Sequence, residues 1–110
     1  MLPKAALACL LTLPLTITVP VASAQDFVLV IKDHRFDPTE LQVPAGQKLR
    51  LVVKNGDATP EEFESNTLNR EKVIPGNGEA TILIGPLEPG RYEFFGEFHQ
   101  DSAKGVLIAQ

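Results

Sequence analysis

Two short segments of the sequence concentrate the side chains that could bind a metal ion. One is EEFES at residues 61–65, and the other is FFGEFHQDSAKG at residues 94–105, close to the end of the chain. The candidate ligands in these segments are Glu61, Glu62, Glu64, Glu97, His99 and Asp101. Carboxylates with one imidazole suit ferrous and ferric iron, manganese, zinc and cupric copper, whereas cuprous copper prefers sulfur.

A third polar segment, DHRFD at residues 33–37, contains Asp33, His34 and Asp37. These residues could bind a metal, but they fall between the first two expected strands, where a loop with polar side chains is ordinary. We therefore place His34 outside the main site. It would contribute only if its loop lay at the same end of the fold.

Motifs of the common hydrolases, metalloproteases and phosphate-binding enzymes are absent from the sequence. It contains no G-x-S-x-G, no H-E-x-x-H and no phosphate-binding glycine loop, and its serines have no evident base partner. We expect no catalytic side chain and no hydrolase activity.

The first 24 residues have the pattern of a secretory signal peptide. Lys4 precedes an apolar run, and Ala22-Ser23-Ala24 is a small-x-small cleavage signal. A lipoprotein signal around Cys9 is a weaker alternative, because too few residues precede the cysteine. We expect a periplasmic domain of residues 25–110, starting at Gln25.

Removing residues 1–24 removes the only cysteine and the only methionine of the chain. The remaining domain cannot form disulfides, zinc ribbons, iron-sulfur clusters or a copper-thiolate bond. Loss of Lys4 leaves nine basic and fourteen acidic residues, a net charge of −5. An acidic surface of this kind disfavours nucleic acid as a partner and favours cations.

Short β-branched and alternating segments predict an all-β fold. Strands are expected over 27–32, on both sides of the turn at 44–46 within 41–55, and over 80–84 and 106–109. Pro and Gly turns separate them, and the spacing predicts a Greek-key β-sandwich of six to eight strands. The segment 65–73 is expected to hold at most one helical turn and to cross between the two sheets.

The order of three segments resembles the cupredoxin family. They are FDPTELQVPAGQ (36–47), LVVKNGDATPEEFES (51–65) and PLEPGRYEFFGEFHQDSAKGVLIA (86–109). The chain is most similar to the periplasmic cupredoxin-like proteins associated with bacterial iron uptake, which carry EEFES-like and EFH-like segments. The resemblance implies that the two acidic segments lie side by side at one end of the sandwich.

The sequence departs from the blue-copper pattern at every ligand. In that pattern a histidine follows the Asn-ended strand, and the C-terminal loop supplies a cysteine, a histidine five residues later, and a methionine before a glycine. The positions that correspond hold Glu61, Gly96, Asp101 and Lys104. A type 1 copper centre needs a thiolate, so we expect none.

The resemblance gathers five carboxylates and one imidazole on one small surface. Like charges so close repel one another and raise one another's pKa, and a cation would relieve that repulsion. If Phe63 points into the core, Glu61 points the same way and Glu62 and Glu64 point to the other side. A bulge would exchange Glu61 and Glu62 as the first-loop ligand, so both remain candidates.

Iron is the expected metal, because the family resemblance and the oxygen-rich ligand set agree, and copper(II) is the alternative. The expected function is to bind iron for an inner-membrane uptake system and to assist its oxidation, with a permease or another periplasmic component as partner. Two alternatives remain open. The domain could be an adaptor without metal, whose acidic end docks on a basic partner in a membrane complex, or a periplasmic carrier of cupric copper.

Overall fold

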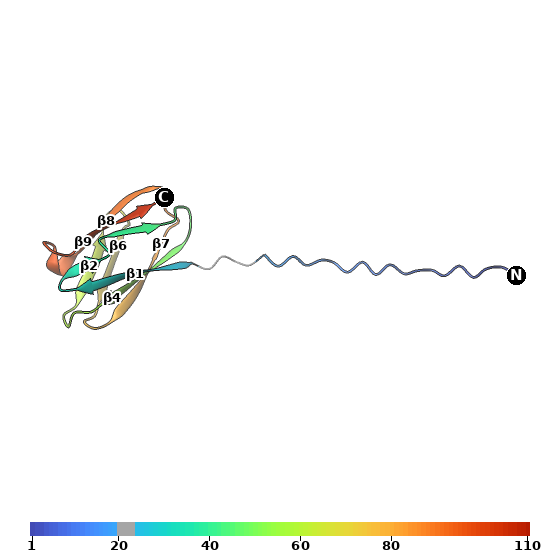
Figure 1. The fold of residues 1–110 in the computed structure, drawn as a ribbon, viewed down its shortest axis with the longest axis horizontal. Coiled ribbons are helices and arrows are strands. Elements are labelled where there is room, and N and C mark those ends of the chain that lie inside the picture. The colour runs from blue at the N-terminus through green and yellow to red at the C-terminus, as the bar shows by residue number, and fades with distance from the viewer. Residues whose placement is uncertain (20–23) are drawn as a thin grey trace.

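The structure, a computed structural model, describes residues 1–19 and 24–110 (Figure 1). Residues 1–19 contain neither helix nor strand. Ala22 and Ser23 of the expected cleavage signal lie outside the described residues, as do Pro20 and Val21. No helix in the described part of the chain is both long and apolar enough to cross a bilayer.

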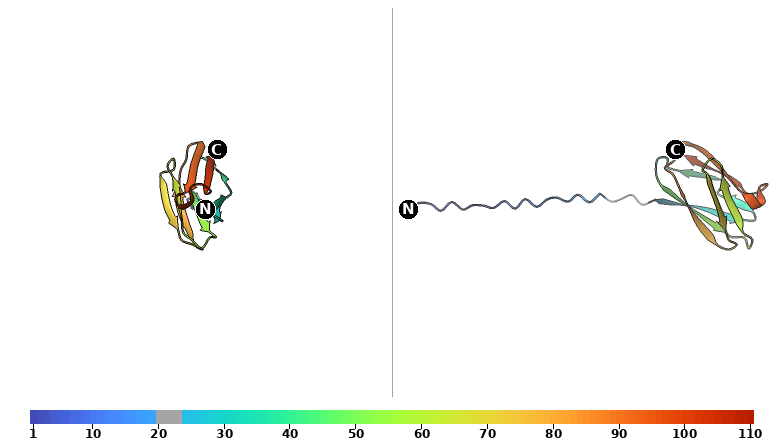
Figure 2. Two further views of the ribbon diagram at one scale, coloured as in Figure 1. Left: turned by 90° about the vertical axis from the view of Figure 1, so that its left-hand side faces the viewer. Right: turned by 180° about the vertical axis from the view of Figure 1, so that it is seen from behind.

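The domain is a sandwich of two mixed β-sheets, as the two opposite views in Figures 1 and 2 show. The first sheet has the order β2-β1-β4-β7 and the second β3-β9-β8-β5-β6. The elements are β1 (Gln25–Lys32), β2 (Arg35–Asp37), β3 (Glu40–Val43), β4 (Leu49–Asn55), β5 (Glu61–Ser65), β6 (Arg70–Ile74), β7 (Glu79–Ile84), β8 (Gly90–Gly96), the 3-10 turn η1 (Glu97–His99) and β9 (Lys104–Ala109).

The predicted all-β sandwich is confirmed, with nine strands among the described residues rather than six to eight. The difference lies in two short strands. β2 has three residues and pairs with β1 across the turn at Asp33 and His34, where a loop is expected. β6 is an edge strand with only Ile74 buried, so no alternation marks it in the sequence.

The prediction that residues 65–73 cross between the sheets is wrong. β5 and β6 form an antiparallel hairpin within one sheet, with Glu64 opposite Glu71. The turn between them spans 66–69 and ends at Asn69, which has a φ of 52°. Asparagine tolerates this left-handed conformation better than most residues, so the chain reverses here instead of crossing.

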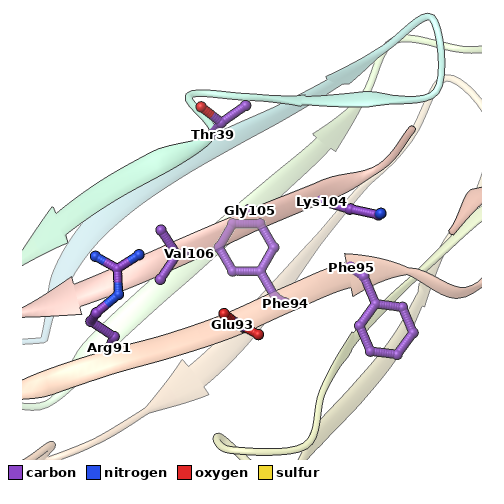
Figure 3. A pocket seen from close by; sticks show the side chains of 8 residues that line it. All are labelled: Thr39, Arg91, Glu93, Phe94, Phe95, Lys104, Gly105 and Val106. Atoms are coloured by element: carbon purple, nitrogen blue, oxygen red, sulfur yellow. The ribbon is translucent and has the colours of Figure 1, made fainter. Parts of the chain in front are cut away.

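The core lies between the sheets and has aromatic rings at its centre. Phe63 is fully buried, 5.2 Å from the ring centre of Phe94 and 6.2 Å from that of Phe36. The Phe94 ring lies against Gly105, where a side chain would collide with it (Figure 3). These contacts fix β5 against β8 and β9, and so fix the strand that carries EEFES.

Candidate metal site at one end of the sandwich

The alternation of β5 divides the predicted ligands between two faces. Glu61, Phe63 and Ser65 are buried, whereas Glu62 and Glu64 are half-buried on the outer face of the sheet. The predicted alternation is therefore confirmed. The expectation of one shared surface is wrong, because side chains that alternate along a strand cannot meet on the same side of it.

Glu61 is a buried carboxylate that contacts the C-terminal loop. It is 1% exposed. Its Oε1 accepts the backbone N–H of Phe98 at 2.9 Å and that of Glu62 at 3.0 Å, and its Oε2 lies 2.5 Å from His99 Nδ1. The two acidic segments thus do meet, as the resemblance implies, and the residues that meet are Glu61 and His99. We call this contact the inner pair.

His34 joins the inner pair, contrary to its placement outside the main site. Its ring is stacked on that of His99, with ring centres 3.5 Å apart and planes inclined by 12°. The turn between β1 and β2 therefore lies at the same end of the sandwich as η1 (Figure 1). Both histidines of the chain are at this end.

Asp57 fixes the turn that carries His34. The two residues of the turn, Asp33 and His34, have left-handed φ values of 51° and 56°. Their backbone N–H groups donate to the Asp57 carboxylate at 2.9 and 3.0 Å. The hydrogen bond from the His34 N–H is the largest cause of the lowered pKa of Asp57. Ser102 adds a hydrogen bond of 2.6 Å to the His34 carbonyl.

Gly96, at the position that corresponds to the copper-binding cysteine, leaves no room for a thiolate. A Cβ at this residue would lie 2.6 Å from Glu61 Cδ and 2.7 Å from Ala103 Cβ. The space beside the glycine is thus filled by the Glu61 carboxylate. The residues present do not fit a type 1 copper centre, as their types in the sequence also indicate.

The second group of acids is on the outer face of β5 and β6. Glu62, Glu64 and Glu71 each offer an oxygen, and these atoms all lie within 4.8 Å of one another. Glu97, the first residue of η1, lies close enough to Glu64 to raise the pKa of that carboxyl group. We call these four residues the outer carboxylate cluster.

Hydrogen bonds between carboxyl groups perturb the titration of this cluster. A hydrogen bond with Glu71 is the main cause that raises the pKa of Glu62 to about 7, and desolvation and neighbouring carboxylates add to it. A hydrogen bond with Glu97 likewise raises the pKa of Glu64. Such pairs hold a proton between them because two charged carboxylates in contact repel.

This perturbation predicts how the stability of the metal-free protein depends on pH. The pKa of Glu62 is raised in the folded state, so its stabilising contribution is complete below about 4.5 and is lost as pH rises through about 7. We expect the urea midpoint to fall from pH 5 to pH 8, and Glu62→Gln to reduce that fall. Glu40→Gln, on the far edge of the same sheet, is the charge-matched control. An unchanged pH profile in Glu62→Gln would contradict the assignment.

Asp101, the remaining predicted ligand, belongs to neither group. It is exposed in the turn that follows η1. The five-residue spacing used to assign it does not apply here, because η1 brings His99 rather than Asp101 to Glu61.

Sequence reasoning did not include Glu71 and set aside His34. A signal for Glu71 was available, because a four-residue turn at 66–69 places Glu64 and Glu71 directly opposite each other. For His34 the sequence offers no comparable signal. Its contact with His99 depends on how β1, β4 and η1 are assembled.

A separate hollow of about 500 Å³ lies beside β8 and β9 and contains none of the predicted ligands (Figure 3). Its wall combines basic, acidic and aromatic side chains, among them Arg91, Glu93, Phe95 and Lys104. The candidate metal-binding residues are therefore on the surface and at the end of the sandwich rather than in this hollow.

Solved structures of blue copper proteins share this fold. Auracyanin A of Chloroflexus aurantiacus superposes with a TM-score of 0.67 at 18% identity, covering 77% of this chain and 98% of its own. Amicyanin of Paracoccus versutus gives a TM-score of 0.60 at 18% identity, covering 84% and 85%. At this level of identity the similarity establishes the fold.

Sequence comparison gives a relative and a family. "Uncharacterized protein RP394" of Rickettsia prowazekii (strain Madrid E) is 49% identical over 80 residues, which are 73% of this chain and 64% of that protein's length. The family described as "Cupredoxin-like domain" matches residues 5–109. This chain therefore belongs to the cupredoxin-like domain family.

Proposed function

We propose that this protein binds iron in the periplasm at the outer carboxylate cluster, and that it serves an inner-membrane iron uptake system. One observation carries the proposal. Oxygens of Glu62, Glu64 and Glu71 lie within 4.8 Å of one another on the outer face of the sheet, with Glu97 beside them.

The chemistry of the cluster favours a hard or borderline cation. Glu62, Glu64 and Glu71 form an all-oxygen ligand set, which suits ferrous and ferric iron and manganese better than cuprous copper. The cation would replace the protons that carboxyl pairs share without metal, and it would remove the repulsion between them. Oxygen ligands also favour ferric over ferrous iron, so the site would assist oxidation if an electron acceptor were supplied.

The proposed location and partner come from the sequence. The signal-peptide pattern of residues 1–24 supports export to the periplasm. The resemblance to iron-uptake cupredoxin-like proteins supports an inner-membrane permease, or another periplasmic component, as the partner that receives the iron. No electron acceptor is evident among the residues that the structure describes, so oxidation would require one from that system.

The proposal is tested by titrating the processed protein, prepared without metal, with ferrous iron, manganese, zinc and cupric copper under anaerobic conditions. Calorimetry should show iron and manganese binding that Glu62→Gln/Glu64→Gln weakens by about 100-fold, equivalent to about 2.7 kcal/mol. Bound metal should also raise the melting temperature, since it stabilises the folded state by mass action.

The control is Glu40→Gln/Glu79→Gln, which removes the same charge from β3 and β7 and should keep the wild-type affinity. Equal loss in both double variants would show that only net charge matters. Absence of binding and of a melting shift with all four metals would refute the proposal.

A cupric-copper carrier is the second candidate function, and the stacked rings of His34 and His99 favour it. Imidazole is a good ligand for cupric ion. In this case electron paramagnetic resonance of the copper-loaded protein would show nitrogen coupling that His34→Phe/His99→Phe abolishes. With either function the copper spectrum should be pale, because no thiolate is present for intense charge transfer.

A further inference from the structure

We infer that Glu61 is a positioning residue rather than a metal ligand: through η1 it holds Glu97 at the outer carboxylate cluster. This inference rests on the proposed function, and it assigns to the buried carboxylate a role on the opposite face of its own strand. Three observations carry it.

The Glu61 carboxylate already has partners for its oxygens. Two backbone N–H groups donate to Oε1, and His99 Nδ1, in the tautomer that carries hydrogen there, donates to Oε2. A carboxylate offers about four acceptor positions, and Glu61 is only 1% exposed. Three of these positions are occupied, so a metal ion would compete with hydrogen bonds for a carboxylate that solvent hardly reaches.

The 3-10 turn η1 is not held against β5 by buried side chains of its own. None of its residues is buried, and Phe98 is 49% exposed. The ladder between β5 and β8 has two residue pairs and ends where Gly96 faces Phe63. Beyond that point, η1 is connected to β5 by the hydrogen bonds of Glu61 to Phe98 and His99 and, on the outer face, by the carboxyl pair of Glu64 and Glu97.

Positioning η1 also positions Glu97, because Glu97 is its first residue and directly precedes Phe98. His99 points to the inner pair while Glu97 hydrogen-bonds Glu64 in the outer cluster. β5 shows the same division, with Glu61 inward and Glu62 outward. The inner pair thus connects, from within the sandwich, the two segments that supply the outer ligands.

Comparison of Glu61→Gln with Glu61→Leu separates a positioning role from ligation. Glutamine keeps an oxygen that accepts from the two backbone N–H groups, and its amide N–H can donate to His99 Nδ1 once that ring adopts the other tautomer, but it loses the charge that a ligand would supply. Leucine keeps a similar volume and loses every hydrogen bond. Manganese affinity, measured by electron paramagnetic resonance, should change by less than about threefold in Glu61→Gln and fall about tenfold or more in Glu61→Leu.

A double-variant cycle tests whether Glu61 changes manganese affinity through Glu97. Once Glu97→Gln has removed the ligand that Glu61 positions, Glu61→Leu should cause little further loss, because residues that act through one contact are not additive. His99→Phe keeps an aromatic ring against His34 but cannot donate to Glu61, and it should cause a smaller loss of a few-fold. This variant also tests the inference if Glu61→Leu does not fold.

A second readout is independent of metal. Nuclear Overhauser contacts between Glu97 and Glu64 in the metal-free protein should persist in Glu61→Gln and disappear in Glu61→Leu, or in His99→Phe if the leucine variant is unfolded. A loss of manganese affinity in Glu61→Gln as large as in Glu97→Gln would show that Glu61 is a ligand. Unchanged Glu97 contacts in Glu61→Leu would also overturn the inference. Failure of the wild type to bind metal would refute the proposed function, and the contacts would still decide the positioning role.

Discussion

Replacing Phe63 by alanine is expected to reduce the free energy of unfolding by about 4 kcal/mol, since large-to-small changes of a buried phenylalanine leave a cavity as well as losing apolar burial. Phe63 is fully buried between Phe36 and Phe94, and it is the residue whose inward direction sends Glu62 and Glu64 outward. Urea unfolding followed by circular dichroism measures the loss.

Phe98→Ala is the matched control, because the same chemical change at a half-exposed ring in η1 should alter stability by less than about 0.5 kcal/mol. Similar losses in the two variants would contradict the assignment of Phe63 to the centre of the core.

Gly96→Ala is expected to cost about 3 kcal/mol, at the upper end of what overpacking of a close-packed interior costs. The new methyl group would lie 2.6 Å from Glu61 Cδ and 2.8 Å from Glu61 Oε1, so the carboxylate must move away from Phe98 and His99. The variant should therefore lose stability and, if Glu61 positions Glu97, manganese affinity as well.

Gly90→Ala provides the comparison on the same strand. A Cβ at Gly90 would meet only the Tyr92 ring, at 3.8 Å, which is an ordinary van der Waals distance. Its unfolding midpoint should stay near the wild-type value. A Gly96→Ala protein as stable as Gly90→Ala would show that Glu61 can leave its place without cost.

Local patterns in the sequence were sufficient for the fold class. Alternation and turn residues mark the longer strands, because a strand with one buried face repeats every two residues. The strands β2 and β6 were not predicted from this pattern. β2 has only three residues, and β6 is an edge strand with one buried side chain, so neither shows a two-residue period.

The same alternation also determined the inward direction of Glu61 and the outward direction of Glu62 and Glu64, once Phe63 was taken as core. The expectation that no type 1 copper centre forms rests on composition, because residues 25–110 contain no cysteine. Both conclusions depend on neighbouring residues or on residue types, which a sequence states directly.

Only the tertiary structure decided which of these side chains meet. Glu61 and His99 are 38 positions apart, and their contact exists because β5 and β8 pair and η1 turns back over the end of the sheet. His34 reaches His99 because Asp57 holds the β1–β2 turn at the same end. Glu71 joins the outer carboxylate cluster through the β5–β6 register. These contacts are set by strand pairing and loop packing between distant segments, and no local periodicity in the sequence encodes them.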